Sequence, residues 1–344
     1  MKHTELPAPE FFDPAKAGHV WRVPYGERAA QAEQWARVHG LSPAAQDSPR
    51  ICLIPIDLQN TFCLPDYELF VAGRSGRGAV DDNVRLCRFI YRNLGRITEI
   101  HPTLDTHTAM QIFHPVFWVD ARGEHPHPYT VITLEDLRRG AWLVNPAVAH
   151  SVGHGDYGSL QKHAVHYVKR LTEGGKYPLI VWPYHAMIGG VGHALASLVE
   201  EALFFHCIAR SSQTGFQVKG RHPLTENYSV FRPEVLDTYD GRPIATKNID
   251  FIETLLSFEA VIIAGQAKSH CVAWTIDDLL AEILPQDPAL VSKVYLLEDC
   301  TSPVVVPGND FTDQANAAFK RFAEAGMHVV RSTDPIEAWP DITS

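Results

Sequence analysis

One cysteine, Cys271, lies where a thiol could act as a nucleophile. It follows an apolar run at 260–265 and directly precedes an amphipathic segment at 272–284, a pattern that indicates a strand, a turn and the start of a helix. The N-terminus of a helix carries partial positive charge and unpaired N–H groups, which favour a thiolate and can hold an oxyanion. Because a buried cysteine is more often a small apolar core residue, other residues must decide its role.

Two further residues could activate such a thiol. Asp57 ends the first strong strand pattern, Ile-Cys-Leu-Ile-Pro-Ile-Asp at 51–57, and open parallel sheets build their sites at the carboxyl ends of strands. Its ordinary alternative role is to cap the turn that follows. Lys219 lies in an apolar-flanked segment, where a lysine needs a carboxylate partner, although taken alone it is a typical surface residue.

Asp105 and His107 could bind a metal ion. They alternate in an extended segment, so both side chains can point the same way and share one divalent ion. His185, which ends the motif Trp-Pro-Tyr-His, would complete a set of two histidines and one carboxylate that suits Zn, Mn or Fe(II). Spacing leaves the third ligand open, and His114 is the main substitute for His185.

The elements that must position these residues alternate between strands and helices, which predicts a parallel α/β sheet. The expected strands are apolar runs at 51–58, 97–104, 179–182, 260–265, 294–297 and 328–330. The expected helices have apolar residues three or four apart and lie at 26–39, 84–94, 192–203, 249–256, 272–284 and 311–325. We therefore expect a doubly wound, Rossmann-like α/β fold with a mainly parallel six-stranded sheet and helices on both faces.

The regular pattern is interrupted in two places. Residues 1–48 precede the first strong strand and predict an N-terminal extension to a main domain at 49–335. Within that domain, a His-, Gly- and Pro-rich stretch at about 115–177 predicts an insertion. A connection of this length usually forms a lid or an oligomer contact.

Composition excludes several classes of function. The chain has 344 residues, 45% of them hydrophobic, and can bury a large core. Its net charge of −10 comes without a long basic run, so we expect no nucleic-acid partner. No apolar run approaches the ~18 residues of a membrane span, and no signal-peptide core is visible, so we expect a cytoplasmic protein without a membrane partner. Six scattered cysteines favour reduced thiols.

Together these motifs resemble those of the isochorismatase-like cysteine hydrolases. The resemblance rests on Asp57 in Ile-Asp-Leu-Gln-Asn-Thr-Phe, on Lys219 ten residues before Ser229, and on Cys271 in Ala-Gly-Gln-Ala-Lys-Ser-His-Cys-Val. The Asp-x-His motif at 105–107 and the Trp-Pro-x-His motif at 182–185 are most similar to those of nicotinamidases. The resemblance covers roughly residues 50–332.

The resemblance implies a catalytic triad of Asp57, Lys219 and Cys271 that acts on an amide through a thioester. It also implies a cis peptide bond between Gln266 and Ala267, beside the oxyanion-binding turn at Cys271. The implied metal ligands are Asp105, His107 and His185, with zinc as the first candidate and manganese or iron as alternatives. The implied substrate-binding residues are aromatic or line the pocket wall: Phe62, Trp182, Tyr228 and His270.

The expected function is that of a nicotinamidase, which converts nicotinamide and water to nicotinate and ammonia, with a small amide as substrate and homo-oligomers as the assembly. Two departures affect the substrate. Lys268-Ser-His270 stands where nicotinamidases often carry an acidic residue and an aromatic, and the chain is longer than a ~200-residue single domain. The alternatives are another amidase or ureido hydrolase, an isochorismatase-type vinyl-ether cleavage that Cys271 disfavours, and a non-catalytic metal-binding or small-molecule-binding scaffold.

Overall fold

The computed structural model describes residues 5–175 and 177–342, and the chain divides into two compact units. The first unit comprises Met1–Leu104, Ala194–Gln217 and Ile249–Ser344, and the second comprises Asp105–His193 and Val218–Asn248. The predicted N-terminal extension at 1–48 lies in the first unit, apart from residues 1–4, which are outside the described residues. The predicted insertion at 115–177 lies in the second unit, apart from residue 176, which is likewise outside them.

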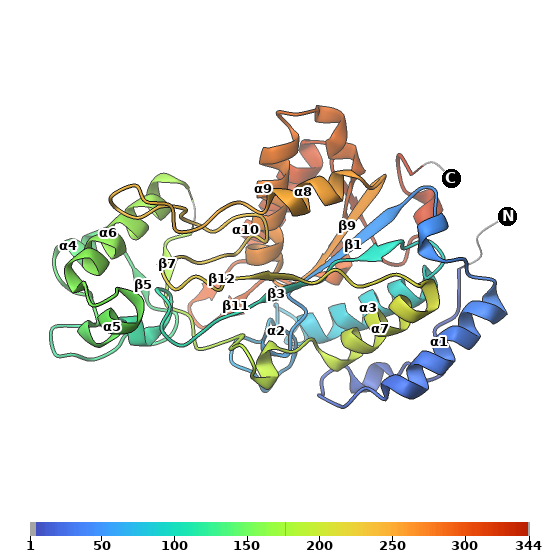
Figure 1. Ribbon diagram of the computed structural model, residues 1–344, viewed down its shortest axis with the longest axis horizontal. Coiled ribbons are helices and arrows are strands. Elements are labelled where there is room, and N and C mark those ends of the chain that lie inside the picture. The colour runs from blue at the N-terminus through green and yellow to red at the C-terminus, as the bar shows by residue number, and fades with distance from the viewer. Residues whose placement is uncertain (1–4, 176, 343–344) are drawn as a thin grey trace. The chain divides into compact units, whose positions relative to one another are not determined.

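A parallel five-stranded sheet forms the centre of the first unit (Figure 1). Its order is β13–β10–β9–β1–β2. The strands are β1 (Ile51–Ile56), β2 (Glu99–Ile100), β9 (Ala260–Gly265), β10 (Val294–Leu297) and β13 (His328–Val330). Every residue of β1, β9 and β10 is buried, which is why these strands appear in the sequence as continuous apolar runs.

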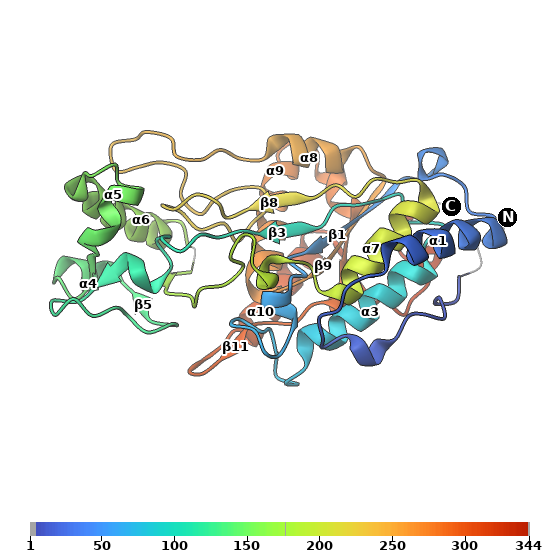
Figure 2. The same ribbon diagram turned by 60° about the horizontal axis from the view of Figure 1, so that its bottom comes forward.

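Helices cover both faces of this sheet (Figures 1 and 2). One face carries α3 (Gly78–Arg92) and α7 (Ser197–Arg210), and α1 (Tyr25–His39) packs against α7. The other face carries α8 (Ile249–Leu256), α9 (Ala273–Ile283) and α10 (Thr312–Glu324). The predicted doubly wound α/β fold is confirmed. The first unit also contains the short helix α2 (Asn60–Cys63) and a hairpin of β11 (Val305–Val306) and β12 (Asn309–Asp310).

The central sheet has five described strands where six were expected. The apolar run at 179–182 gives β7 (Leu179–Ile180), which pairs antiparallel with β5 (Val131–Ile132) in the second unit. Pro183 ends the run, since proline has no N–H with which to continue a strand. The expected strand at 97–104 is also divided at Pro102, into β2 and β3 (Thr103–Asp105), and β3 pairs with β8 (Gln217–Lys219) in a separate two-stranded sheet.

Pro55 occupies β1, a position that a central strand normally excludes because proline has no N–H. In β1, the N–H of Ile51 donates to Thr98 Oγ1 on the side where β2 lies. Since N–H directions alternate along a strand, residue 55 faces the same side as residue 51. The pairing of β1 with β2 ends at Leu53. Pro55 lies beyond it, so no hydrogen bond to β2 is lost through the missing N–H.

The second unit is built of short elements. Its strands, apart from the ends of β3 and β8, are β4 (Trp118–Val119), β5, β6 (Leu143–Val144) and β7, and its helices are α4 (Leu134–Arg138), α5 (Ala149–Val152) and α6 (Tyr157–Glu173). The 17-residue helix α6 lies where the sequence predicted no regular pattern. Asp156 caps its N-terminus by accepting from Ser159 N–H. None of the helices in the described residues combines the length and apolarity needed to cross a membrane.

Gly265 allows β9 and β1 to approach closely. Its φ is +114°, and a Cβ atom on it would lie 2.2 Å from Ile56 O. Gly265→Ala should therefore lower the free energy of unfolding by more than about 2 kcal/mol, measured by urea denaturation. Gly308→Ala is the matched control, because Gly308 also has a positive φ, +82°, but no neighbour within 4 Å. Equal losses in the two variants would contradict the role given to the backbone contact.

Candidate functional site

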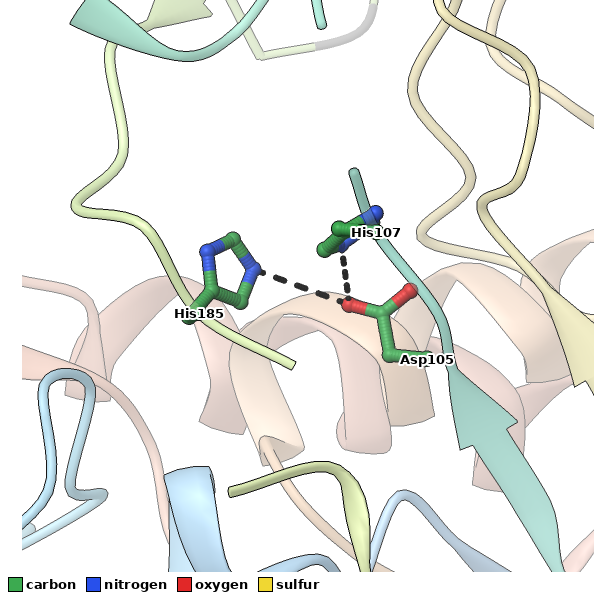
Figure 3. Close-up of side chains that lie close together, drawn as sticks. All are labelled: Asp105, His107 and His185. Carbon is green, nitrogen blue, oxygen red and sulfur yellow. Dashed lines mark hydrogen bonds and ion pairs between the residues drawn. The ribbon is translucent and has the colours of Figure 1, made fainter. Parts of the chain in front are cut away.

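Asp105, His107 and His185 form a compact group of potential metal ligands in the second unit (Figure 3). All three are buried, and their ligand atoms lie within 4.8 Å of one another. Figure 3 shows both imidazole rings directed toward the carboxylate. His107 Nε2 lies 2.8 Å from Asp105 Oδ2, and His185 Nε2 lies 3.7 Å from the same oxygen.

Backbone carbonyl groups fix the tautomers of both histidines. The Nδ1–H of His107 donates to Gly220 O at 3.0 Å, and the Nδ1–H of His185 donates to Pro183 O at 2.8 Å. Because a carbonyl oxygen only accepts, Nε2 of each neutral ring presents its lone pair toward Asp105. Carbonyl partners of this kind orient metal-ligating histidines. The donor set therefore fits a divalent ion such as zinc.

His114, the alternative third ligand, lies beside this group without belonging to it. Its ring centroid is 5.8 Å from those of His107 and His185. Its Nδ1 donates to Thr108 O at 3.1 Å, and burial lowers its pKa to about 3. Among the described residues, the metal-type group contains His185 and not His114.

Lys219 is buried in the same unit and contacts the candidate ligands. Its Nζ donates to Asp105 Oδ1 at 3.0 Å and to Asn227 O at 2.9 Å. Burial alone would raise the pKa of Asp105, but the positive charges of His107 and Lys219 hold it well below its usual range. The Asp105 charge in turn raises the pKa of His107 in spite of burial. The 2.8 Å contact between His107 Nε2 and Asp105 Oδ2 therefore needs a positive charge, which a proton on Nε2 or a bound divalent ion would supply.

Gly220 is required next to this group. Its φ is +81°, and a Cβ atom on it would lie 2.7 Å from both Asp105 Oδ1 and His107 Cε1. The backbone at residue 220 can pass this close to Asp105 and His107 only because glycine has no side chain.

Glu226 is a buried acid that sequence reasoning missed. Its Oε1 accepts from Asn227 N–H at 2.9 Å, and Oε2 has no hydrogen-bond partner among the described residues. Burial raises its pKa to about 7, although the charge of His107 opposes this shift. It lies two residues before Tyr228, but the sequence around it does not distinguish a buried glutamate from one on the surface.

In the first unit, Cys271 lies in the turn between β9 and α9. The turn, Lys268–Val272, has π-helical geometry, and Cys271 is 7% exposed. The peptide bond between Gln266 and Ala267 is cis. Ala267 O accepts from the N–H groups of His270 at 3.0 Å and Val272 at 3.2 Å, which ties the turn together.

A buried carboxylate behind this turn was also missed from the sequence. Asp82, on α3, accepts from Gln266 Nε2 at 2.8 Å, and Gln266 Oε1 accepts from Ser302 N–H at 3.3 Å. The backbone of the turn is joined to the same segment, since Lys268 N–H donates to Ser302 O at 2.8 Å. These contacts hold Gln266, the residue that precedes the cis bond, in place.

Asp57 directly follows β1 and is completely buried. Its N–H donates to Thr103 Oγ1 at 3.0 Å, and the Thr103 hydroxyl donates to Asp57 Oδ1. Ile56 and Gly265 are paired in the parallel register, so Asp57 and Gln266 follow paired positions on neighbouring strands. The chain segments that carry Asp57 and Cys271 therefore leave the same edge of the sheet.

The predicted substrate-binding residues belong to both units. In the second unit, Trp182 Nε1–H donates to the Tyr228 hydroxyl at 2.9 Å. In the first unit, Phe62 lies on α2, and His270 stacks edge-on against Phe311 with ring centroids 4.8 Å apart. Burial lowers the pKa of His270 to about 3, so its ring is neutral at pH 7.

Glu226 gives the second unit a predictable dependence on pH. Its pKa is about 7 in the folded protein and 4.5 for an ordinary glutamate, so between these values the folded state holds a proton that the unfolded chain has released. The free energy of unfolding should therefore fall as the pH rises from about 5 to 7. Glu226→Gln cannot ionise and should remove about 1 to 3 kcal/mol of that fall.

Urea denaturation at several pH values between about 5 and 8 measures this slope, with the exposed Glu173→Gln as the control. A slope that is the same in Glu226→Gln and in the parent protein would show that Glu226 does not carry the effect.

Comparison with known proteins identifies solved structures that share the fold of this chain. No protein-family model matches the chain, and neither does any curated protein. A nicotinamidase/pyrazinamidase of Acinetobacter baumanii matches with a TM-score of 0.50 and 18% identity, over 84% of this chain and 99% of that one. The yeast nicotinamidase Pnc1p, bound to the inhibitor nicotinaldehyde, matches with a TM-score of 0.51 and 17% identity, over 82% of this chain and 99% of that one. The resemblance expected from the sequence is confirmed at the level of structure: this chain has the fold of the nicotinamidases.

Proposed function

We propose that this protein is a cysteine amidohydrolase of the nicotinamidase type, which converts nicotinamide and water to nicotinate and ammonia. The observation that carries the proposal is the position of Cys271, in a tightly bonded turn between β9 and α9, with Asp57 at the end of the adjacent strand β1. The nicotinamidases that share the fold support nicotinamide as the first substrate to test.

In the first half of the reaction, Asp57 takes the thiol proton of Cys271. The thiolate then forms a C–S bond with the amide carbonyl carbon, and the carbonyl electron pair moves to oxygen. N–H groups of the turn before α9 would stabilise that oxyanion. The resemblance assigns Lys219 the role of holding Asp57 ionised, and this pairing stays a prediction.

In the second half, the C–N bond breaks and ammonia leaves with the proton that Asp57 had taken. Water then attacks the thioester, gives one proton to Asp57, and releases the carboxylic acid as the C–S bond breaks. Asp57 returns its proton to the Cys271 thiolate, which restores the starting state. Each turnover therefore consumes one amide and one water.

The proposed metal site uses Asp105, His107 and His185, with zinc as the first candidate and manganese or iron as alternatives. A divalent ion bound there would supply a Lewis-acid contact for the ring nitrogen of the substrate, directly or through water. The chain itself holds both imidazoles as Nδ1–H tautomers through Gly220 O and Pro183 O. Lys219 keeps the carboxylate of Asp105 ionised.

Cys271→Ala should abolish ammonia release from nicotinamide, because no other group in the scheme forms the thioester. Ammonia release is measured with the purified variant, and circular dichroism and metal content report on its fold. Cys207→Ala, at a partly buried cysteine on α7, is the matched control and should retain activity. Substantial hydrolysis by Cys271→Ala would exclude the scheme, and ammonia from other small amides but not from nicotinamide would favour the related amidases.

His107→Ala should remove the bound divalent ion, since it deletes one of three converging ligands. Elemental analysis of the purified protein measures metal per chain, with a value near one expected for the parent protein. His150→Ala, at an exposed histidine of the same unit, is the control and should leave the metal content unchanged. Full metal content in His107→Ala would contradict the site, and a metal-loaded parent protein without amidase activity would favour the scaffold alternative.

A further inference from the structure

A cavity lies in the first unit, and none of its lining residues belongs to the turn at Cys271. It has a volume of about 620 Å³ and is lined by residues 5–6, 38–42 and 46–49, by the end of α3 and the turn after it, and by Arg210 and Glu337. This volume falls within the range of about 300–1,000 Å³ that is typical of small-molecule sites. We call it the arginine cavity, because Arg92, Arg96 and Arg210 line it.

Two guanidinium groups of the arginine cavity, those of Arg96 and Arg210, have a hydrogen-bond donor to spare. Nη2 of Arg96 and Nε of Arg210 are buried and make no hydrogen bond with the described residues. The side chains of Arg96 and Arg210 are only 11% and 2% exposed. Buried donors without an acceptor are costly, and planar guanidinium groups match the oxygen atoms of phosphates and carboxylates.

Each arginine faces one carboxylate, which keeps the lining near neutral. The pairs are Arg92 with Glu5, Arg96 with Glu337 and Arg210 with Asp47. The first two pairs join the arginine Nε to a glutamate Oε1 at 3.4 Å, and the side chains of Glu5 and Glu337 are 40% and 36% exposed. These two carboxylates can turn to water when an anionic ligand takes their place at the arginines.

Asp47 contributes an unpartnered hydrogen-bond acceptor to the cavity, in contrast to the unpartnered donors of the arginines. Its Oδ1 pairs with Arg210, whereas its Oδ2 is buried and makes no hydrogen bond with the described residues. A carboxylate oxygen accepts only, so its partner is a donor from a ligand or from water in the cavity. The cavity thus combines two donors for an anion with one acceptor for a hydroxyl group, in a space far larger than a single phosphate ion.

We propose that the arginine cavity binds a phosphorylated sugar, either free or as part of a nucleotide. The phosphate oxygens accept from Arg96 and Arg210, and a sugar hydroxyl donates to Asp47 Oδ2. The site is separate from the proposed amidase chemistry, so binding does not require Cys271.

Isothermal titration calorimetry on the full chain tests this proposal, with ribose 5-phosphate, AMP, inorganic phosphate and ribose as probes. We expect saturable binding of at least one of the two phosphate esters, and binding at least tenfold weaker for inorganic phosphate and for ribose. Comparison of ribose 5-phosphate with AMP distinguishes a free sugar phosphate from a nucleotide. Cys271→Ala should bind with unchanged affinity.

Arg96→Gln should lower the affinity for the bound ester by about 10- to 100-fold, because it removes charge-assisted hydrogen bonds to the phosphate. Arg37→Gln, at an exposed arginine of α1 outside the cavity lining, should have no effect. Arg96→Lys keeps the charge opposite Glu337 and replaces Arg96→Gln if that variant does not fold. It should weaken binding because the planar fork is lost.

Three results would overturn the proposal. The first is no binding of either ester at millimolar concentration. The second is undiminished affinity in the folded Arg96 variant. The third is equal affinity for inorganic phosphate and the esters, which would indicate an adventitious anion only.

Discussion

The parallel pairing of β1 with β9 is the constraint on which the first unit depends. Ile56 and Gly265 are partners in that register, and Gly265 has no side chain to separate the two backbones. The two strands therefore end together, and the segments that carry Asp57 and Cys271 leave from one edge of the sheet. A slip of one residue would turn every side chain of β1 to the opposite face, so the packing of both faces of the sheet also fixes the geometry of this edge.

Much of the fold could be predicted because buried parallel strands leave a strong signal. The runs at β1, β9 and β10 are apolar throughout, and the structure buries every residue in them. The prediction was wrong for 179–182, where an equally apolar run pairs with β5, since apolarity reports burial and not the partner strand. Helix α6 was missed inside the insertion because surrounding glycines, prolines and histidines obscured its pattern of buried residues.

The candidate site could be predicted where residue types lie close together in sequence or at strand ends. Asp105 and His107 are two residues apart, and the structure brings His185 to them. The buried environments of Lys219 and Glu226 could not be predicted, because an isolated lysine or glutamate looks the same in sequence whether it is buried or solvated. Burial is decided by β8 and the segment after it, which place Lys219 against Asp105. Asp82 was missed for the same reason, since its link to Gln266 joins α3 to a turn about 180 residues later.

The sheet order also affects how the chain can fold during synthesis. One of the two inner pairings joins β1 to β9, about 200 residues later, and the second unit lies between them in the sequence. At about 5–20 residues per second, a ribosome needs roughly 10–40 seconds to make that stretch. Throughout this time β1 is an apolar strand without its main partner, and such strands expose the nascent chain to aggregation. A shortened chain that ends before β9 lacks this partner altogether, so that edge of β1 stays unpaired.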